Sequence, residues 1–233
     1  MAYRPLLSLL FLFLISSSLS AQGIQWESNY GGTESDDCRE LNKTSDGGFI
    51  LCGPSYSSNL DVGGNNGARD FWINKINAQG TIQWEANYGG SSDDIARSVI
   101  QTHDSGYAIA GVSSSSDGDV GGNNGNQDFW IIRSDSSGNL LWEENYGGSS
   151  TENASSIVQA SDSGFVVVGR SYSSTGDVGG NNGNADHWVI KLDPQGNLLW
   201  EENFGGSSFD VARSVVETND GGYAVAGEAR SKG

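Results

Sequence analysis

Oxygen-bearing side chains recur in one loop pattern, Asp-Val-Gly-Gly-Asn-Asn-Gly-x-x-Asp, which the chain contains three times. Hard cations such as calcium take about six to eight oxygen ligands, and glycines let the backbone supply some of them. The same residues also build purely structural loops, in which Asn and Gly adopt left-handed turns and Asp caps backbone amides. Calcium and a structural loop therefore both remain open, although the spacing does not match the EF-hand loop. The candidate ligands are Asp61, Asn65, Asn66 and Asp70; Asp119, Asn123, Asn124 and Asp128; and Asp177, Asn181, Asn182 and Asp186.

Further carboxylates follow each Gly-Gly pair, next to an arginine in most copies. Carboxylates held about 5 to 10 Å apart can hydrolyse glycosides. Because these recur from copy to copy beside Arg39, Arg97 or Arg213, we expect ion pairs between neighbouring repeats instead. The carboxylates are Glu34, Asp36, Asp37, Asp93, Asp94, Glu152 and Asp210.

The chain is not predicted to be an enzyme. Its two histidines, His103 and His187, stand with no unique Ser or Cys in a recognisable arrangement. No phosphate loop or dinucleotide fingerprint occurs, because no helical sequence follows the Gly-Gly pairs. No cofactor other than calcium is indicated. Tyr56 and Tyr172 are the aromatic residues that we expect to be exposed and available to a sugar ring.

The two cysteines, Cys38 and Cys52, lie in the same repeat, where later copies carry small apolar residues. They flank one turn on consecutive strands, which predicts either a cross-strand disulfide or two buried free thiols.

These residues sit in a repeat with a step of 58 residues. Trp26, Trp84, Trp142 and Trp200 show this step, and so do Trp72, Trp130 and Trp188. The second copy predicts strands at 94–102, 107–112, 128–134 and 139–146, joined by tight turns and one long loop. Four strands in one repeat predict an all-β, β-propeller-like array of four-stranded antiparallel units. A parallel β-helix is the competitor, but its loops recur at about nine residues.

Segments of each unit carry a family resemblance. Asp-Gly-Gly-Tyr stands at 220–223, Gly-Arg-Ser-Tyr-Ser at 169–173, Gly-Asp at 176–177, Asp-His-Trp-Val-Ile-Lys-Leu-Asp at 186–193, Gly-Asn-Leu-Leu-Trp at 196–200 and Tyr-Gly-Gly at 146–148. In these segments residues 26–227 resemble the secreted repeat proteins common in Bacteroidetes. Members usually carry more repeats and a C-terminal domain for type IX secretion, which this chain lacks. The segment 193–200 also resembles the tryptophan-docking motif of quinoprotein-type propellers, which implies a tryptophan wedged between neighbouring blades.

The repeat count predicts partial units at both ends. Residues 24–30 read as a fourth strand, three full units follow, and the last unit has two strands. A minimal ring, a half-ring completed by self-association and a fragment of a longer gene are the three interpretations, and the last two are favoured.

The N-terminal residues predict export. Residues 1–21 have a basic start, a short apolar run and a small-residue cleavage site, as in a signal peptide, with a signal anchor as the alternative. Residues 22–233 form the repeat domain, with no later membrane span. A net charge of −17 disfavours nucleic acid.

We therefore expect a secreted or cell-surface, non-enzymatic module that binds a glycan or protein, or serves as a scaffold. The alternatives are a carbohydrate-active hydrolase or lyase with channel-facing carboxylates, and a calcium-stiffened structural array.

Overall fold

The computed structural model describes residues 24–230, which fold entirely as β-structure. Fourteen strands form three four-stranded antiparallel sheets, here called blades 1 to 3, and one two-stranded sheet, the half-blade. Blade 1 contains β1 (Glu40–Lys43), β2 (Phe49–Ser55), β3 (Asp70–Ile76) and β4 (Ile82–Tyr88). Blade 2 contains β5 (Asp94–Gln101), β6 (Tyr107–Ser113), β7 (Asp128–Ser134) and β8 (Leu140–Tyr146). Blade 3 contains β9 (Glu152–Gln159), β10 (Phe165–Ser171), β11 (Asp186–Leu192) and β12 (Leu198–Phe204). The half-blade contains β13 (Asp210–Glu217) and β14 (Tyr223–Ala229).

Each blade is a meander in which consecutive strands pair, as the sequence pattern predicts. The turn between β7 and β8 shows why the chain reverses there. Asp135 Oδ1 accepts hydrogen bonds from the amides of Ser137 and Asn139, and Gly138 has a φ of 80°. Glycine is favoured in that left-handed conformation because it has no Cβ to clash.

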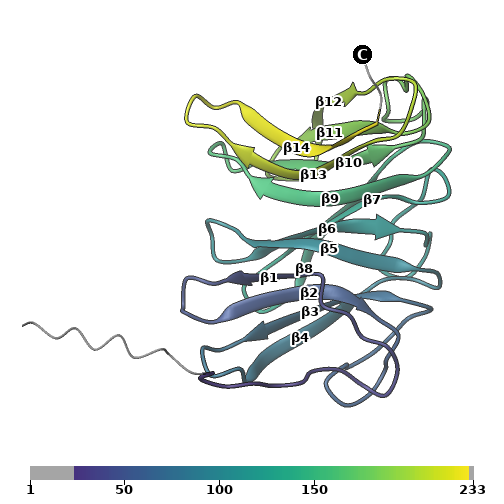
Figure 1. Ribbon diagram of the computed structural model, residues 1–233. Helices are drawn as coiled ribbons and strands as arrows, with labels where there is room; N and C mark the ends of the chain where they lie inside the picture. Colours follow the sequence, from purple (N-terminus) through teal and green to yellow (C-terminus); the bar gives the residue numbers. More distant parts are fainter. Residues whose placement is uncertain (1–23, 231–233) are drawn as a thin grey trace, which may run out of the picture.

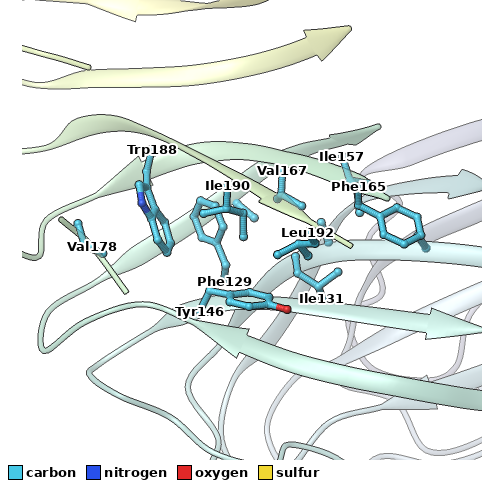
Figure 2. Packing of buried hydrophobic residues seen from close by; sticks show 13 residues of the cluster. Phe129, Ile131, Tyr146, Ile157, Phe165, Val167, Val178, Trp188, Ile190 and Leu192 are labelled. Carbon is cyan, nitrogen blue, oxygen red and sulfur yellow. The ribbon is translucent and has the colours of Figure 1, made fainter. Parts of the chain in front are cut away.

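The blades stack face to face, and the core lies between them (Figure 1). Figure 2 shows the core between blades 2 and 3, where Phe129 of β7 meets Trp188 of β11. Their ring centroids are 4.6 Å apart, and Phe71 and Trp130 repeat the contact at 4.6 Å between blades 1 and 2. One of the two tryptophan series is therefore core, because buried aromatic area dominates such interfaces.

The other tryptophan series docks blade 1 onto blade 2 and blade 2 onto blade 3. Trp84 of blade 1 donates its Nε1–H to the carbonyl of Ser136, in the β7–β8 turn of blade 2, at 3.1 Å. Its ring lies 5.4 Å from that of Tyr107 and covers Gly138 so closely that a Cβ there would lie 2.9 Å away. This is the wedge between blades that the tryptophan-docking motif implies.

The first strands of successive sheets, β1, β5, β9 and β13, lie side by side and are called the inner strands. Figure 1 shows the short first hairpin of every sheet at the left and the long loops at the right. The long loops are residues 56–69, 114–127 and 172–185, and the side of the stack that carries them is called the loop end. Residues at the loop end that lie near the inner strands therefore come close together, although they belong to different blades.

Residues 24–30 correct one prediction, because they are ordered along blade 1 but form no strand. A strand needs a hydrogen-bonded neighbour, and the described residues place none beside this segment. Trp26 still docks like its counterparts, with Nε1 donating to the carbonyl of Ala78 at 2.9 Å. Blade 1 and the half-blade lie at opposite ends of the stack, so the described residues form no closed ring (Figure 1).

The signal peptide expected at residues 1–21 lies outside the described residues, and the extent of the repeat domain stays a prediction. Within residues 24–230, no helix is long and apolar enough to cross a membrane.

Candidate ligand-binding surface

The Asp-Asn-Asp loops use their oxygens to hold the backbone. In blade 1, Asp61 Oδ2 accepts the amide of Gly31 at 3.3 Å. Asn65 Oδ1 accepts the amide two residues further on at 2.8 Å. Asp70 Oδ2 accepts the amide of Asn66 at 2.6 Å. Such hydrogen bonds from backbone amides are the contacts expected of a purely structural loop.

The other two loops repeat these contacts. Amide donors face Asp119, Asn123 and Asp128 in blade 2, and Asp177, Asn181 and Asp186 in blade 3. The described residues hold no group of three or more His, Cys, Asp or Glu side chains that could bind a metal. Calcium binding by mixed Asp, Asn and carbonyl oxygens stays a prediction.

A buried pair of carboxylates lies at each junction between blades. Asp70 and Asp94 are both fully buried and face each other across Gly89. A Cβ on this glycine would lie 2.3 Å from Asp70 Oδ1 and 2.9 Å from Asp94 Oδ2. Burial and the nearby charge of Asp94 raise the pKa of Asp70 to about 6, although the Asn66 amide opposes the shift. Asp128, facing Glu152 across Gly147, also has a pKa raised to about 6 by burial and by that neighbour.

Both cysteines are free thiols, with Cys38 exposed and Cys52 buried. The expected disulfide assumed that they face each other across the hairpin. The register instead pairs Cys52 with Glu40, two residues beyond Cys38. Burial raises the pKa of the Cys52 thiol, which keeps it protonated and unreactive in the fold.

The expected ion pairs between repeats form only in part. Asp93 does pair across a blade junction, but its partner is Arg69, at 2.7 Å, and not the neighbouring Arg97. Arg39 pairs within its own blade with Asp37 at 3.0 Å. The buried carboxylates that follow Gly-Gly instead cap backbone amides, as Asp94 Oδ2 does for Gly90 at 2.8 Å.

Arginine occupies one equivalent position on three of the inner strands. Arg97 lies in β5 and Arg213 in β13, where the ladder register shifts at that residue, and Arg39 stands just before β1. Such a bulge turns the side chain away from its normal direction. Blade 3 carries Ser155 at this position. The inner strands thus direct three guanidiniums toward one region at the loop end.

Two more arginines join them around aromatic rings. The Arg170 guanidinium lies 5.8 Å from the ring of Tyr172 and 5.2 Å from that of Phe209. Arg230 lies 5.3 Å from the same Phe209 ring. These distances are those of cation–π contacts. In the register of blade 3, Arg170 faces Asn153, whose Oδ1 accepts a hydrogen bond from Arg97 Nη2 at 3.3 Å.

Arg69 completes the group, with its guanidinium 5.5 Å from the ring of Tyr56. Tyr56 is 46% exposed, while Tyr172 is half-buried, so one of the two expected exposed tyrosines is the more accessible. The arginine cluster is defined as Arg39, Arg69, Arg97, Arg170, Arg213 and Arg230.

The arginine cluster carries more positive charge than its carboxylate partners neutralise. Its ion pairs use Asp37, Asp93 and Glu228, the last shared by Arg213 and Arg230. Among the described residues, Arg97 and Arg170 form no ion pair, and the buried Nε–H of each has no hydrogen-bond partner. Burial and then the charges of Arg170 and Arg39 lower the pKa of Arg97. This is a local positive region on an acidic chain.

Sequence reasoning named Arg39, Arg97 and Arg213 only as ion-pair partners of the carboxylates and missed the other members. The sequence does distinguish these other members, because they are absent from the equivalent positions of the other repeats. Arg69 has Gln127 and Ala185 as its counterparts, so it is not part of the repeat. The same holds for Arg170, Arg230 and Phe209. Unrepeated residues are not needed by every blade, so they mark the chain's own function better than the loops do.

Of the two histidines, only His187 lies beside the arginine cluster, opposite Arg170 in the β10–β11 ladder. His103 is in the β5–β6 turn, and His187 Nε2 lies 3.1 Å from the carbonyl of Glu228. The expectation that the chain is not an enzyme stays untested.

No family model matches the chain. It is 28% identical over 201 residues to the Regulatory protein FlaEY of Caulobacter vibrioides. That match covers 81% of this chain but spans only 20% of the length of FlaEY. A solved protein of unknown function from Bacteroides caccae is 11% identical, with a TM-score of 0.44 over 82% of this chain and 53% of that one. This structural likeness is too weak to carry an argument.

Proposed function

We propose that the chain is an exported, non-enzymatic module that binds a glycan or protein ligand through the loop end of its stack. One observation supports this most. Arginines in or next to blade 1, blade 3 and the half-blade meet aromatic rings there, and several of these residues are absent from the equivalent positions in other repeats. The tryptophan and loop contacts recur from one blade junction to the next, whereas the Arg69–Asp93 pair and the Arg170–Phe209 contact each occur at one junction, so stacking in general does not depend on them.

Convergent polar groups beside aromatic side chains are typical of binding sites. The long loops also leave this end of the stack free of the tight hairpin turns. The match to a protein described as regulatory agrees with a binding role.

The test measures binding of the full chain to a panel of neutral and acidic glycans by calorimetry. We expect saturable binding to at least one glycan, weakened about fivefold by Tyr56→Ala, a change at the loop end. The matched control is Leu141→Ala, which removes an exposed apolar side chain from β8. Absence of saturable binding, or equal loss in both variants, would contradict the proposal.

A calcium-stiffened array is the second candidate, and the buried carboxylates favour it. Asp70, Asp128 and Asp186 each have a buried Oδ1 with no hydrogen-bond partner among the described residues. A cation bound to these oxygens would stabilise the fold by about 2.7 kcal/mol at a hundredfold excess over Kd. We expect calcium to raise Tm and a chelator to lower it, with a smaller shift in Asp70→Asn. Identical melting curves with calcium and chelator would exclude this role.

A further inference from the structure

We propose that the arginine cluster binds the oxyanion group of a short acidic saccharide, either the carboxylate of a uronic acid or a sulfate ester. This ligand class rests on the proposed binding function and names its chemistry. Arg97 and Arg170 are the residues that would contact the oxyanion, and Tyr56 and the ring of Tyr172 would flank the sugar.

Arg97 and Arg170 have unused hydrogen-bond donors that suit an oxyanion. Asn153 lies between Arg97 and Arg170, accepting from the first and pairing in the ladder with the second. The buried Nε–H groups of both arginines have no partner among the described residues. A buried donor without a partner costs free energy, and two guanidiniums in one place suit a carboxylate or sulfate through parallel hydrogen bonds.

The arginine cluster also has an excess of positive charge. Four of the six guanidiniums of the arginine cluster form ion pairs, with three carboxylates, and the unpaired Arg97 lies within electrostatic range of Arg170, Arg39 and Arg213. Like charges held together destabilise the fold unless an anion lies between them. An anion at this place would therefore stabilise the folded state.

The acidity of the whole chain limits the size of the ligand. The chain as a whole carries a net charge of −17 and repels a long polyanion or a strongly acidic protein. A saccharide of a few units carries only one or a few negative charges, which the arginine cluster can neutralise. Aromatic rings interleaved with the arginines offer apolar faces to a sugar ring, which an isolated inorganic ion would not use.

The experiment compares the full chain with Arg97→Gln, Arg170→Gln and Arg97→Lys. Lys43→Gln is the matched control, because it removes one positive charge from an exposed position at the other end of β1. The probes are a short oligogalacturonide, a sulfated disaccharide, the uncharged oligosaccharide of equal length and a short poly-glutamate peptide. Calorimetry gives Kd, and the melting temperature of each variant checks that it is folded.

We expect an acidic saccharide to bind and each Gln variant to lose about tenfold or more in affinity. Arg97→Lys should lose part of this affinity, because lysine keeps the positive charge but not the paired donors of the guanidinium. Lys43→Gln should bind as tightly as the parent chain. The carboxylate and sulfate probes distinguish the two oxyanion sources. Equal binding of the neutral oligosaccharide, or binding unaffected by Arg97→Gln, would overturn this inference while the proposed function stood. Binding of the peptide alone would overturn the saccharide assignment, and no binding of any probe, glycan or peptide, would remove both.

A variant that is expected to bind more tightly tests the inference without relying on a loss of affinity, which misfolding could also cause. Ser155→Arg places a fourth guanidinium at the position where the other inner strands carry arginine. We expect it to raise affinity for the acidic saccharide about threefold and to leave the neutral probe unchanged. Unchanged or weaker binding of the acidic saccharide by a folded Ser155→Arg protein would count against the inference.

Discussion

Carboxylates in this chain have opposite environments at the two ends of a blade. At the hairpin turn of blade 1, hydrogen bonds from Lys75 and Thr44 hold the pKa of Asp46 well below its usual range. At the blade junctions, burial and a second carboxylate raise the pKa of Asp70 and Asp128 to about 6. Asp46 therefore stabilises the fold when it is ionised, whereas Asp70 and Asp128 stabilise it when they are protonated.

The sign of the pH dependence follows from these shifts. Because Asp70 and Asp128 have folded pKa values above the unfolded value, the folded state binds more protons between about pH 4 and 6. Their contribution is full below pH 4 and is lost as the pH rises through 6. We expect thermal stability to be higher at pH 5 than at pH 7.5, and to fall again below about pH 4 as Asp46 and its equivalents become protonated.

The double variant Asp70→Asn and Asp128→Asn should remove most of the loss between pH 5 and 7.5. We expect it to gain about 2 to 3 kcal/mol per site at pH 7.5, the equivalent of a shift of about two pKa units. Denaturant unfolding at both pH values measures this. Glu202→Gln removes an exposed charge from β12 and is the control, and the same gain in that variant would contradict the argument.

At the scale of elements, the strand that ends one blade is joined to the turn of the next. The tryptophan of the fourth strand bonds to a turn carbonyl, and the hydroxyl of Tyr88 donates to the carbonyl of Gly138 at 2.5 Å. Burial raises the pKa of Tyr88 to about 12, which keeps the hydroxyl a donor. These contacts need the turn of the next blade. A tryptophan of a fourth strand therefore stabilises the fold less where the described residues include no such turn.

We predict that Trp84→Phe costs about 1 to 2 kcal/mol of unfolding free energy, because it loses the bond to Ser136 and part of the contact with Tyr107. The matched change Trp200→Phe should cost less than about 0.5 kcal/mol, since Trp200 is 40% exposed. Denaturant unfolding measures both. Equal costs would show that docking onto a turn is not what stabilises the blades.

At the scale of the whole molecule, burial falls most toward the half-blade, while β3 of blade 1 is still buried along its whole length. β6 and β7 are buried along their whole length, whereas most of β14 is exposed and β1 is buried at no residue. In stacked repeats each unit is stabilised by its neighbours, so a sheet with one neighbour opens more easily.

Amide hydrogen exchange should therefore be slowest in β6 and β7 and at least about tenfold faster in β13 and β14. Mass spectrometry of peptides from each blade measures the order. Uniform protection across the sheets would mean that the stack opens as one cooperative unit.

Much of the fold was predictable because it depends on local signals. The strands of blade 2 begin and end within about one residue of the predicted bounds, since alternation and turn residues act over a few positions. The segment 24–30 failed because a strand also needs a partner. The choice between a disulfide and free thiols stayed open because it depends on the strand register, which pairs Cys52 with Glu40, two residues beyond Cys38, and which the hydrophobic pattern does not reveal.

By itself, the sequence determined the four-stranded unit, its 58-residue repetition and the stacking that must bury its aromatic face. Only the tertiary structure decided that Arg69, Arg97 and Arg170 belong to one region, and that Asp70 faces Asp94. The physical reason is that these residues lie on different strands or in different repeats. Their distance depends on how the inner strands pack around an axis, a geometry set by contacts between blades and not by periodicity within one.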